Sequence, residues 1–291
     1  MKNSHLYVIL ILVVLVLFGI YYSGQTKTLN LNTSIIVSNP SVLQKIKNIS
    51  TSPQALVAQK EQSIIDLQNE INKYIRTQNG EWGIVVRDLK TNEVLSINEN
   101  ISISGASTTK ILTAVAVFKK LEASSYNLNT YVSGKTIKNH LTLMVNQSNN
   151  NSWNTLNFWV GFDYMQNLGT ELGMHDFNIS TNQVNPDSME KLLYSLYTKP
   201  IITEADKIFL YSLMQNTIVE DRISAGVPKG TIIYHKHGDY LSNYHDIGIV
   251  MGTTPYTIVV MGTNTTKEGG TRTIAGVSKI VYEYLNQNSA R

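Results

Sequence analysis

Ser107 and Lys110 stand three positions apart at the start of an apolar run that extends to residue 121. The run, with cations at its end, predicts a buried helix over 108–121. Residues three apart share one face of a helix, so the Lys110 amine is expected to reach the Ser107 hydroxyl. A serine needs such a base to become a nucleophile. The helix amino terminus also leaves the Ser107 N–H free for a developing oxyanion.

Lys110 can act as a base only after it loses its proton. An unperturbed lysine has a pKa near 10.4, so only about one side chain in 2,500 is neutral at pH 7. Burial or a nearby cation would lower that pKa. Lys236, far along the chain, is a candidate for the cation.

Each short motif has competitors when it is taken singly. Ser-x-x-Lys recurs at 188–191, and a helix-capping hydroxyl is the ordinary alternative for either serine. Two further candidates recur as well: Ser-x-Asn at 148–150 also occurs at 125–127 and 152–154, and Lys-x-Gly at 236–238 also occurs at 267–269. Only their order and context can select among them.

Hydrophobic periodicity indicates the elements that must position these residues. The expected helices cover 59–76, 108–121, 137–146, 154–172, 187–197, 204–216 and 273–285, and the expected strands cover 83–89, 94–97, 231–236, 246–252 and 256–262. Two early and three late strands can pair in one sheet only if the helical middle lies beside it. The predicted fold class is mixed α+β: an antiparallel five-stranded sheet flanked by the terminal helices, with an all-helical lobe as the other wall of an active-site cleft.

Three segments, taken in order, resemble the active-site motifs of the class A β-lactamase and penicillin-binding-protein superfamily. They are SGASTTKILTAVAVFKKLE, LTLMVNQSNNNSWNTL and VPKGTIIYHKHGDY. The resemblance extends through GIVVRDLKTNEVLSIN and NTIVEDRISAGVP, and covers Lys60 to Asn286. It implies a serine hydrolase or acyl transferase that is acylated by β-lactams or D-alanyl-D-alanine-type peptides, without a metal or organic cofactor.

The resemblance implies a role for each matching residue. Ser107 would be the nucleophile and Lys110 its base, Ser148 would pass a proton to the departing amine, and Asn150 would hold the substrate amide. Lys236 would supply positive charge to Ser148 and to the substrate carboxylate, and the N–H groups of Ser107 and Asp239 would form the oxyanion hole. Substrate-binding positions would also include His237, Gly238 and Arg222. For Arg222, a carboxylate-binding guanidinium competes with an ordinary surface arginine.

The sequence departs from the family pattern in the second and third motifs. His237 replaces the usual Thr or Ser, and an imidazole is larger and titrates near neutrality. Asn149 replaces the Asp of the lactamase motif, a middle position at which penicillin-binding relatives vary. The stretch between the first two motifs is also short, which would reduce one wall of the cleft.

A larger departure lies between Gly173 and Pro186. Class A β-lactamases carry there a Glu-x-x-Leu-Asn loop whose carboxylate activates the deacylating water. Here the segment contains no Glu, and its one carboxylate, Asp176, reads more readily as a turn residue. The resemblance therefore implies competent acylation with slow deacylation. The alternative is a penicillin-binding or sensor module, or a non-catalytic binder of cell-wall peptide.

Composition excludes several other classes of chemistry. The chain has 291 residues, of which 24 are basic, 21 acidic and none is cysteine, so disulfides, thiolate metal sites and a cysteine nucleophile are excluded. The net charge of +3 is too small to indicate a nucleic-acid surface. A metal site at His235, His237, His245 and Asp246 is an alternative, although strand alternation would turn both neighbouring histidines away from Lys236.

The amino terminus predicts a membrane attachment. Leu6 to Tyr22 carries no charge and is just long enough to span a bilayer, with a poor cleavage site after it. We expect an anchor or uncleaved signal over 1–24, a polar stalk over 25–58 and a catalytic domain over 59–291. The expected protein is a single-pass cell-membrane monomer whose domain faces outside the cytoplasm.

Overall fold

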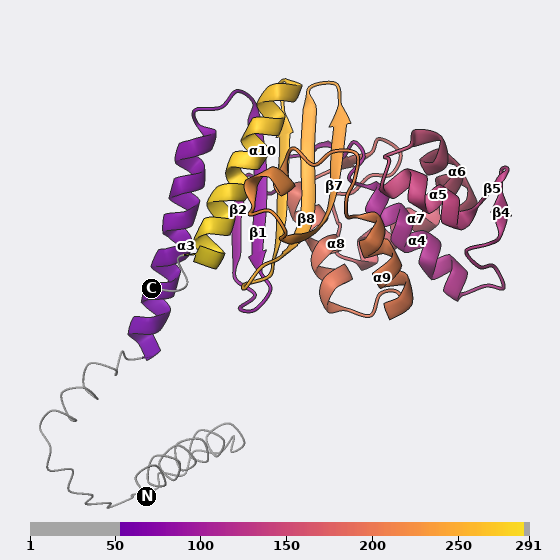
Figure 1. Ribbon diagram of the computed structural model, residues 1–291, viewed down its shortest axis with the longest axis horizontal. Coiled ribbons are helices and arrows are strands. Elements are labelled where there is room, and N and C mark those ends of the chain that lie inside the picture. Colours follow the sequence, from indigo (N-terminus) through magenta and orange to yellow (C-terminus); the bar gives the residue numbers. More distant parts are fainter. Residues whose placement is uncertain (1–52, 288–291) are drawn as a thin grey trace, which may run out of the picture. The chain divides into compact units, whose positions relative to one another are not determined.

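An antiparallel sheet covered by helices on both faces forms the frame of residues 53–287, which the computed structural model describes (Figure 1). The sheet is five-stranded, with the order β2-β1-β9-β8-β7. Its strands are β1 (Glu81–Asp88), β2 (Val94–Ile97), β7 (Ile232–Tyr240), β8 (Asn243–Met251) and β9 (Tyr256–Thr263). The predicted fold class is confirmed, with the early hairpin completing the sheet made by the three late strands.

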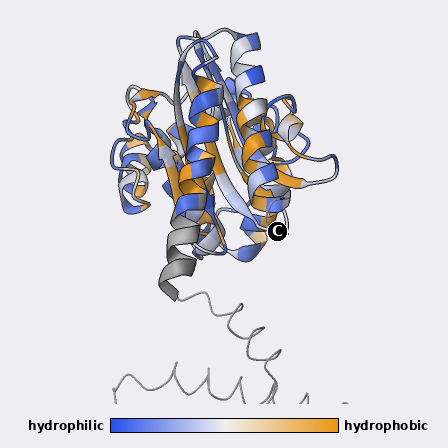
Figure 2. Cartoon of the chain, turned by 90° about the vertical axis from the view of Figure 1, so that its left-hand side faces the viewer, coloured by the Kyte–Doolittle hydropathy of each residue, from blue (hydrophilic) through white to orange (hydrophobic). Residues whose placement is uncertain are grey.

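The two terminal helices, α3 (Pro53–Ile75) and α10 (Lys267–Tyr282), lie over one face of the sheet (Figures 1 and 2). Their apolar positions, including Ile71 and Val277, are buried against Ile84 and Ile258 of the strands. Hydrophobic and hydrophilic residues alternate along both helices, as expected for elements with one buried face (Figure 2). This half of the core holds the sheet rigid behind the cleft.

The helical lobe lies on the other side of the sheet (Figure 1). It contains α4 (Lys110–Glu122), α5 (Ile137–Val145), α6 (Asn150–Val160), α7 (Phe162–Glu171), α8 (Pro186–Thr198) and α9 (Glu204–Leu213). Helix α4 is apolar on all sides and buried from Lys110 to Phe118, so it forms the centre of the lobe. The lobe and the inner sheet face share one hydrophobic cluster.

Helix α8 is joined to the sheet by a buried ion pair. The Arg87 guanidinium of β1 donates to both carboxylate oxygens of Glu190, at 2.6 and 2.9 Å. Glu190 is fully buried and also accepts from Thr257 Oγ1 of β9. Because α8 directly follows the loop at 173–185, this pair also anchors one end of that loop.

Several predicted boundaries were wrong. The helix expected over 154–172 is two helices, because Gly161 has a φ of +102° that a helix cannot contain. The strand expected over 231–236 continues to Tyr240 and so contains the whole third motif. Four short strands were missed: β3 (Ile103–Ser104), β4 (Tyr131–Val132), β5 (Lys135–Thr136) and β6 (Gln183–Val184), as was the 3-10 turn η1 (Ile223–Gly226).

The predicted anchor lies outside the described residues, as does most of the predicted stalk. Helix α3 begins at Pro53, so it includes residues 53–58, the end of the predicted stalk. Within 53–287, no helix has both the length and the apolar character needed to cross a bilayer.

The buried pair predicts a large loss of stability for Glu190→Ala. The substitution leaves the Arg87 guanidinium without its carboxylate, so we expect the free energy of unfolding to fall by about 3 kcal/mol. Urea denaturation measures this. The control is Asp187→Ala, which removes a half-exposed pair with Lys191 and is expected to cost less than about 1 kcal/mol. Equal losses in the two variants would contradict this account.

Candidate active site

The nucleophile candidate lies in a turn just before α4, which begins at Lys110 instead of at the predicted Thr108. Ala106 has a φ of +46°, and the Thr108 and Lys110 N–H groups donate to the carbonyls three residues earlier, Gly105 and Ser107. This turn has the i to i+3 spacing of a 3-10 helix, which brings Ser107 and Lys110 to one side. Ser107 is half-buried, whereas Lys110 is fully buried.

The Lys110 amine makes the contacts that a base for Ser107 would need. Its Nζ lies 2.8 Å from Ser107 Oγ, 2.8 Å from Asn150 Oδ1 and 2.7 Å from the Ser148 carbonyl oxygen. Burial lowers the pKa of Lys110 to about 8. The deficit of neutral amine at pH 7 is therefore reduced from more than a thousandfold to about tenfold.

A second buried amine meets the first at Ser148. Ser148 Oγ lies 3.3 Å from Lys110 Nζ and 3.0 Å from Lys236 Nζ. Burial, and then the charge of Lys110, lower the pKa of Lys236 well below its usual value. Two ammonium groups this close repel each other, so the pair favours carrying one charge. A hydroxyl between them offers a path along which a proton can move.

The second motif positions its residues by a helix cap. The Asn149 side chain accepts from the Ser152 N–H and caps α6, which begins at Asn150. This cap gives the unusual middle residue a structural role, and it leaves the flanking Ser148 and Asn150 side chains directed at Lys110. Ser148 has a φ of +56°, a backbone region that a non-glycine residue rarely adopts.

Strand β7 passes directly beside the nucleophile turn. A Cβ placed on Gly238 would lie 3.1 Å from the Ser107 backbone nitrogen and 3.2 Å from Ala106 Cβ, which is tighter than ordinary contact, so a glycine favours this approach. The approach brings the strand that carries Asp239 beside the Ser107 turn, as the predicted oxyanion hole requires. That hole stays a prediction.

His237 is buried within β7, with Nδ1 3.5 Å from Lys236 Nζ. Burial, and then the charge of Lys236, lower its pKa to about 2. The expectation that His237 titrates near neutrality was therefore wrong, and the side chain is neutral at physiological pH.

Arg222 is fully buried, so its interpretation as a surface arginine was wrong. Its Nη1 donates to the His245 carbonyl oxygen at 2.7 Å, which ties Arg222 to β8. Its Nη2 lies 2.5 Å from Asp239 Oδ1, in an ion pair that is not aligned as a hydrogen bond. The guanidinium therefore contacts the third motif through the Asp239 carboxylate and through the Gly238 carbonyl oxygen, which accepts from Nη1 at 3.4 Å.

A cleft of about 390 Å³ opens over Ser107. The helical lobe contributes Asn150, Trp153 and Asn154, and the third motif contributes Asp239 and Tyr240. The loop at 173–185 supplies Ser180, Thr181 and Asn182, whose side chains are hydroxyls and an amide. Asp239 is the one acidic residue among those that line this described cleft.

The sequence interpretation missed Asn182. Its Oδ1 accepts from Thr109 Oγ1 at 2.7 Å, and its Nδ2 donates to the Ala106 carbonyl at 2.9 Å, so it holds the nucleophile turn from the loop. Its φ of +52° suits Asn, which tolerates this region, but nothing in the local pattern indicated its partners. Asp176 is exposed outside the cleft lining and accepts from Asn185, in accord with a turn role.

The first histidine of the histidine-rich segment is paired with carboxylates. His235 lies between the carboxylates of Asp246 and Glu220, at 3.0 and 3.1 Å. Burial opposes its charge, but these carboxylates outweigh burial and raise the pKa of His235 to about 10. The protonated His235 imidazole therefore already neutralises charge on these two carboxylates. Within residues 53–287 no cluster of three or more potential ligands could hold a metal ion, so the structure gives the metal alternative no support in this part of the chain.

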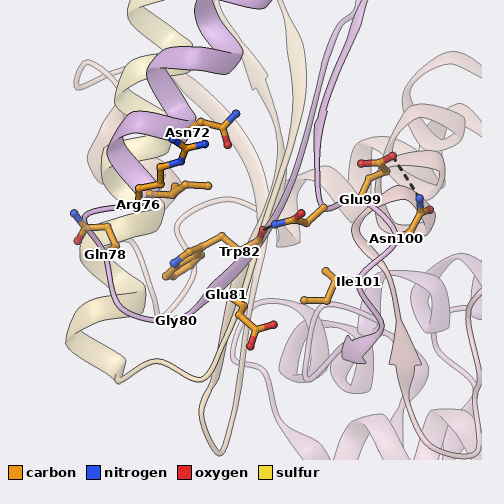
Figure 3. A pocket seen from close by; sticks show the side chains of 11 residues that line it. Asn72, Arg76, Gln78, Gly80, Glu81, Trp82, Glu99, Asn100 and Ile101 are labelled. Atoms are coloured by element: carbon orange, nitrogen blue, oxygen red, sulfur yellow. Dashed lines mark hydrogen bonds between the residues drawn. The ribbon is translucent and has the colours of Figure 1, made fainter.

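Neither the second Ser-x-x-Lys motif nor a second groove among the described residues brings a serine and a lysine together in the way that Ser107 and Lys110 are. Ser188 lies in the first turn of α8, whereas Lys191 pairs with Asp187. A separate groove of about 700 Å³ lies between the end of α3 and the start of β1, lined by residues such as Arg76, Glu81 and Trp82 (Figure 3). No serine or lysine lines that described groove.

Comparisons with known proteins find similarity in sequence and in fold. A sequence model of the Beta-lactamase enzyme family matches residues 66–285. A protein named Beta-lactamase from Bacteroides uniformis is 24% identical over 275 residues, which covers 77% of this chain and 93% of that protein.

Solved structures share the fold. TLA-1 extended-spectrum beta-lactamase is 23% identical with a TM-score of 0.71, covering 77% of this chain and 99% of its own. A class A beta-lactamase representative from Bacteroides cellulosilyticus is 22% identical with a TM-score of 0.71, covering 77% and 99%. PBP-A is 22% identical with a TM-score of 0.71, covering 75% and 95%, and a mutant of it was solved as an acyl-enzyme complex with penicillin G.

The lowered pKa of Lys110 predicts the pH dependence of Ser107 reactivity. The neutral amine is the base, so the rate of Ser107 modification by a fluorophosphonate should rise with pH and level off above about 8. Intact-protein mass spectrometry measures this rate, which should fall about 10²- to 10⁴-fold in Lys110→Met. Lys191→Met, from the competing motif, is the control and should match the wild type. A wild-type midpoint above pH 10 would contradict the assignment.

Proposed function

Because the chain belongs to the Beta-lactamase enzyme family, we propose that it is a serine hydrolase that β-lactams or D-alanyl-D-alanine-type peptides acylate at Ser107, with slow release of the acyl group. The observation that carries this proposal is the 2.8 Å contact between Lys110 Nζ and Ser107 Oγ, made by an amine with a lowered pKa. The acyl-enzyme complex solved for the PBP-A mutant supports the same reaction class.

Acylation uses the groups already in contact. Neutral Lys110 takes the Ser107 proton while Oγ bonds to the substrate carbonyl carbon, and the N–H groups of Ser107 and Asp239 hold the oxyanion. As the carbonyl C–N bond breaks, Ser148 donates its proton to the departing nitrogen. The proton on the Lys110 and Lys236 pair then restores the Ser148 hydroxyl. The Asn150 side chain holds the substrate amide.

Deacylation lacks an evident base. The cleft-lining residues of the loop at 173–185 are Ser180, Thr181 and Asn182, none of which is a carboxylate. Asp239 is engaged with Arg222. A general base contributes about 10²- to 10⁴-fold to a rate, so we propose that the acyl-enzyme persists. Such a protein would act as a penicillin-binding enzyme or sensor more than as an efficient resistance enzyme.

Slow deacylation predicts a burst with a chromogenic cephalosporin. In stopped-flow measurements, product equal to the enzyme concentration should form first, followed by a steady rate at least about a hundredfold slower. A Ser107→Ala variant should show no burst. The other serine, Ser188→Ala, is the matched control and should retain it.

The alternatives give different traces. Fast steady turnover would show that another group supplies the deacylating base. Absence of any burst, together with absence of labelling by a fluorescent penicillin, would favour a non-catalytic binder and overturn the proposal.

We also propose that Leu6 to Tyr22, outside the described residues, anchors the protein in the cell membrane with its catalytic domain outside the cytoplasm. The support is the uncharged run in the sequence and the extracytoplasmic position of cell-wall peptides. We expect the full chain to stay with membranes after an alkaline carbonate wash, and a chain beginning at Gln25 to be released. Release of the uncleaved full chain by that wash would contradict the anchor.

A further inference from the structure

Each cation near the cleft already has a protein partner. The Arg222 guanidinium is 0% exposed and contacts the Asp239 carboxylate and the His245 carbonyl. Lys236 is also 0% exposed, and its Nζ donates to Ser148 Oγ and to the His237 carbonyl, both at 3.0 Å. A substrate carboxylate would need at least one of these groups to give up its present contact.

The cleft surface itself carries no positive group. Its lining residues, all in the described part of the chain, include no lysine, arginine or histidine. They offer hydroxyls, amides and the aromatic rings of Trp153 and Tyr240. His237 beside it is held neutral by burial and by Lys236.

Asp239 adds a negative charge at the end of this surface. Its side chain is 37% exposed and lines the cleft, whereas the Arg222 charge that balances it is buried behind. An incoming anion meets the carboxylate first, and like charges at short range are unfavourable where water is partly excluded. The protein's own carboxylate thus takes the guanidinium that a substrate carboxylate would otherwise use.

We infer that, among β-lactams and D-alanyl-D-alanine-type peptides, this site prefers acyl donors whose leaving-group carboxylate is masked as an uncharged amide or ester where it meets Asp239. This inference rests on the proposed acylation of Ser107 and names the substrate class for that reaction. It replaces the expectation that Arg222 and Lys236 hold a substrate carboxylate.

Two probes that differ in one charge test this preference. Benzylpenicillin and benzylpenicillin methyl ester share the acyl group and ring system, so their second-order rates of Ser107 acylation are compared by intact-protein mass spectrometry. Each rate is divided by that of the probe's uncatalysed hydrolysis. In the wild type, we expect the normalised acylation rate of the ester to be about tenfold higher than that of the acid. In Asp239→Asn, the ratio of ester to acid should fall by about tenfold.

Asp221→Asn is the matched control. Asp221 Oδ1 lies 4.0 Å from Arg222 Nε, and the residue is exposed and outside the cleft lining, so the substitution removes the same charge without touching the cleft. The ester-to-acid ratio should stay at the wild-type value. If Asp239→Asn is unstable, Asp239→Ser provides a second variant at the same position, and its folding is checked by near-UV circular dichroism.

The outcomes separate this inference from the proposed function. Acylation with a preference for the acid, or an unchanged ratio in both Asp239 variants, overturns the inference and leaves the proposed function intact. If neither probe acylates Ser107, the proposed function fails. Equilibrium binding of both probes to Ser107→Ala, followed by Trp fluorescence, then still decides the preference: tighter binding of the ester supports it and tighter binding of the acid overturns it.

Discussion

Two buried lysine amines that share one serine hydroxyl constrain the chemistry of this site. Lys110 and Lys236 lie 3.3 and 3.0 Å from Ser148 Oγ, and neither amine is exposed to solvent. Desolvation and mutual repulsion both disfavour a second charge, so a proton is held less tightly here than on an isolated lysine. In the proposed mechanism, this is why Lys110 can act as the base for the adjacent Ser107.

Close packing of backbone segments maintains this arrangement. Gly238 lets β7 approach the Ser107 nitrogen, and Asn182 binds the nucleophile turn from the opposite loop. Arg222 connects β8 to Asp239 from beneath the strand. The same ion pair that orders the third motif places a carboxylate at the cleft, so one contact links the stability of the site to its choice of substrate.

The sequence predicted those parts of the molecule that depend on local periodicity and motif order. The sheet and the terminal helices followed from periodicity, whereas the convergence of Ser107, Lys110, Ser148 and Lys236 followed from the resemblance of the three ordered motifs to the class A β-lactamase and penicillin-binding-protein superfamily. Other features depend on contacts between distant segments, and these were missed: the buried state of Arg222 and the anchoring role of Asn182. The break at Gly161 was missed because the apolar pattern continues across it, although a glycine within a helical pattern was an available signal.

The protonation of the lysine pair can be measured directly. With lysine labelled at Cε and Nζ, NMR titration of the wild type should show two amines with pKa values well below 10, assigned by Lys110→Met and Lys236→Met. In Lys110→Met the pKa of Lys236 should rise, because the charge of Lys110 contributes to lowering it. Two amines that titrate above 10, or a Lys236 pKa that is unchanged in Lys110→Met, would contradict the account.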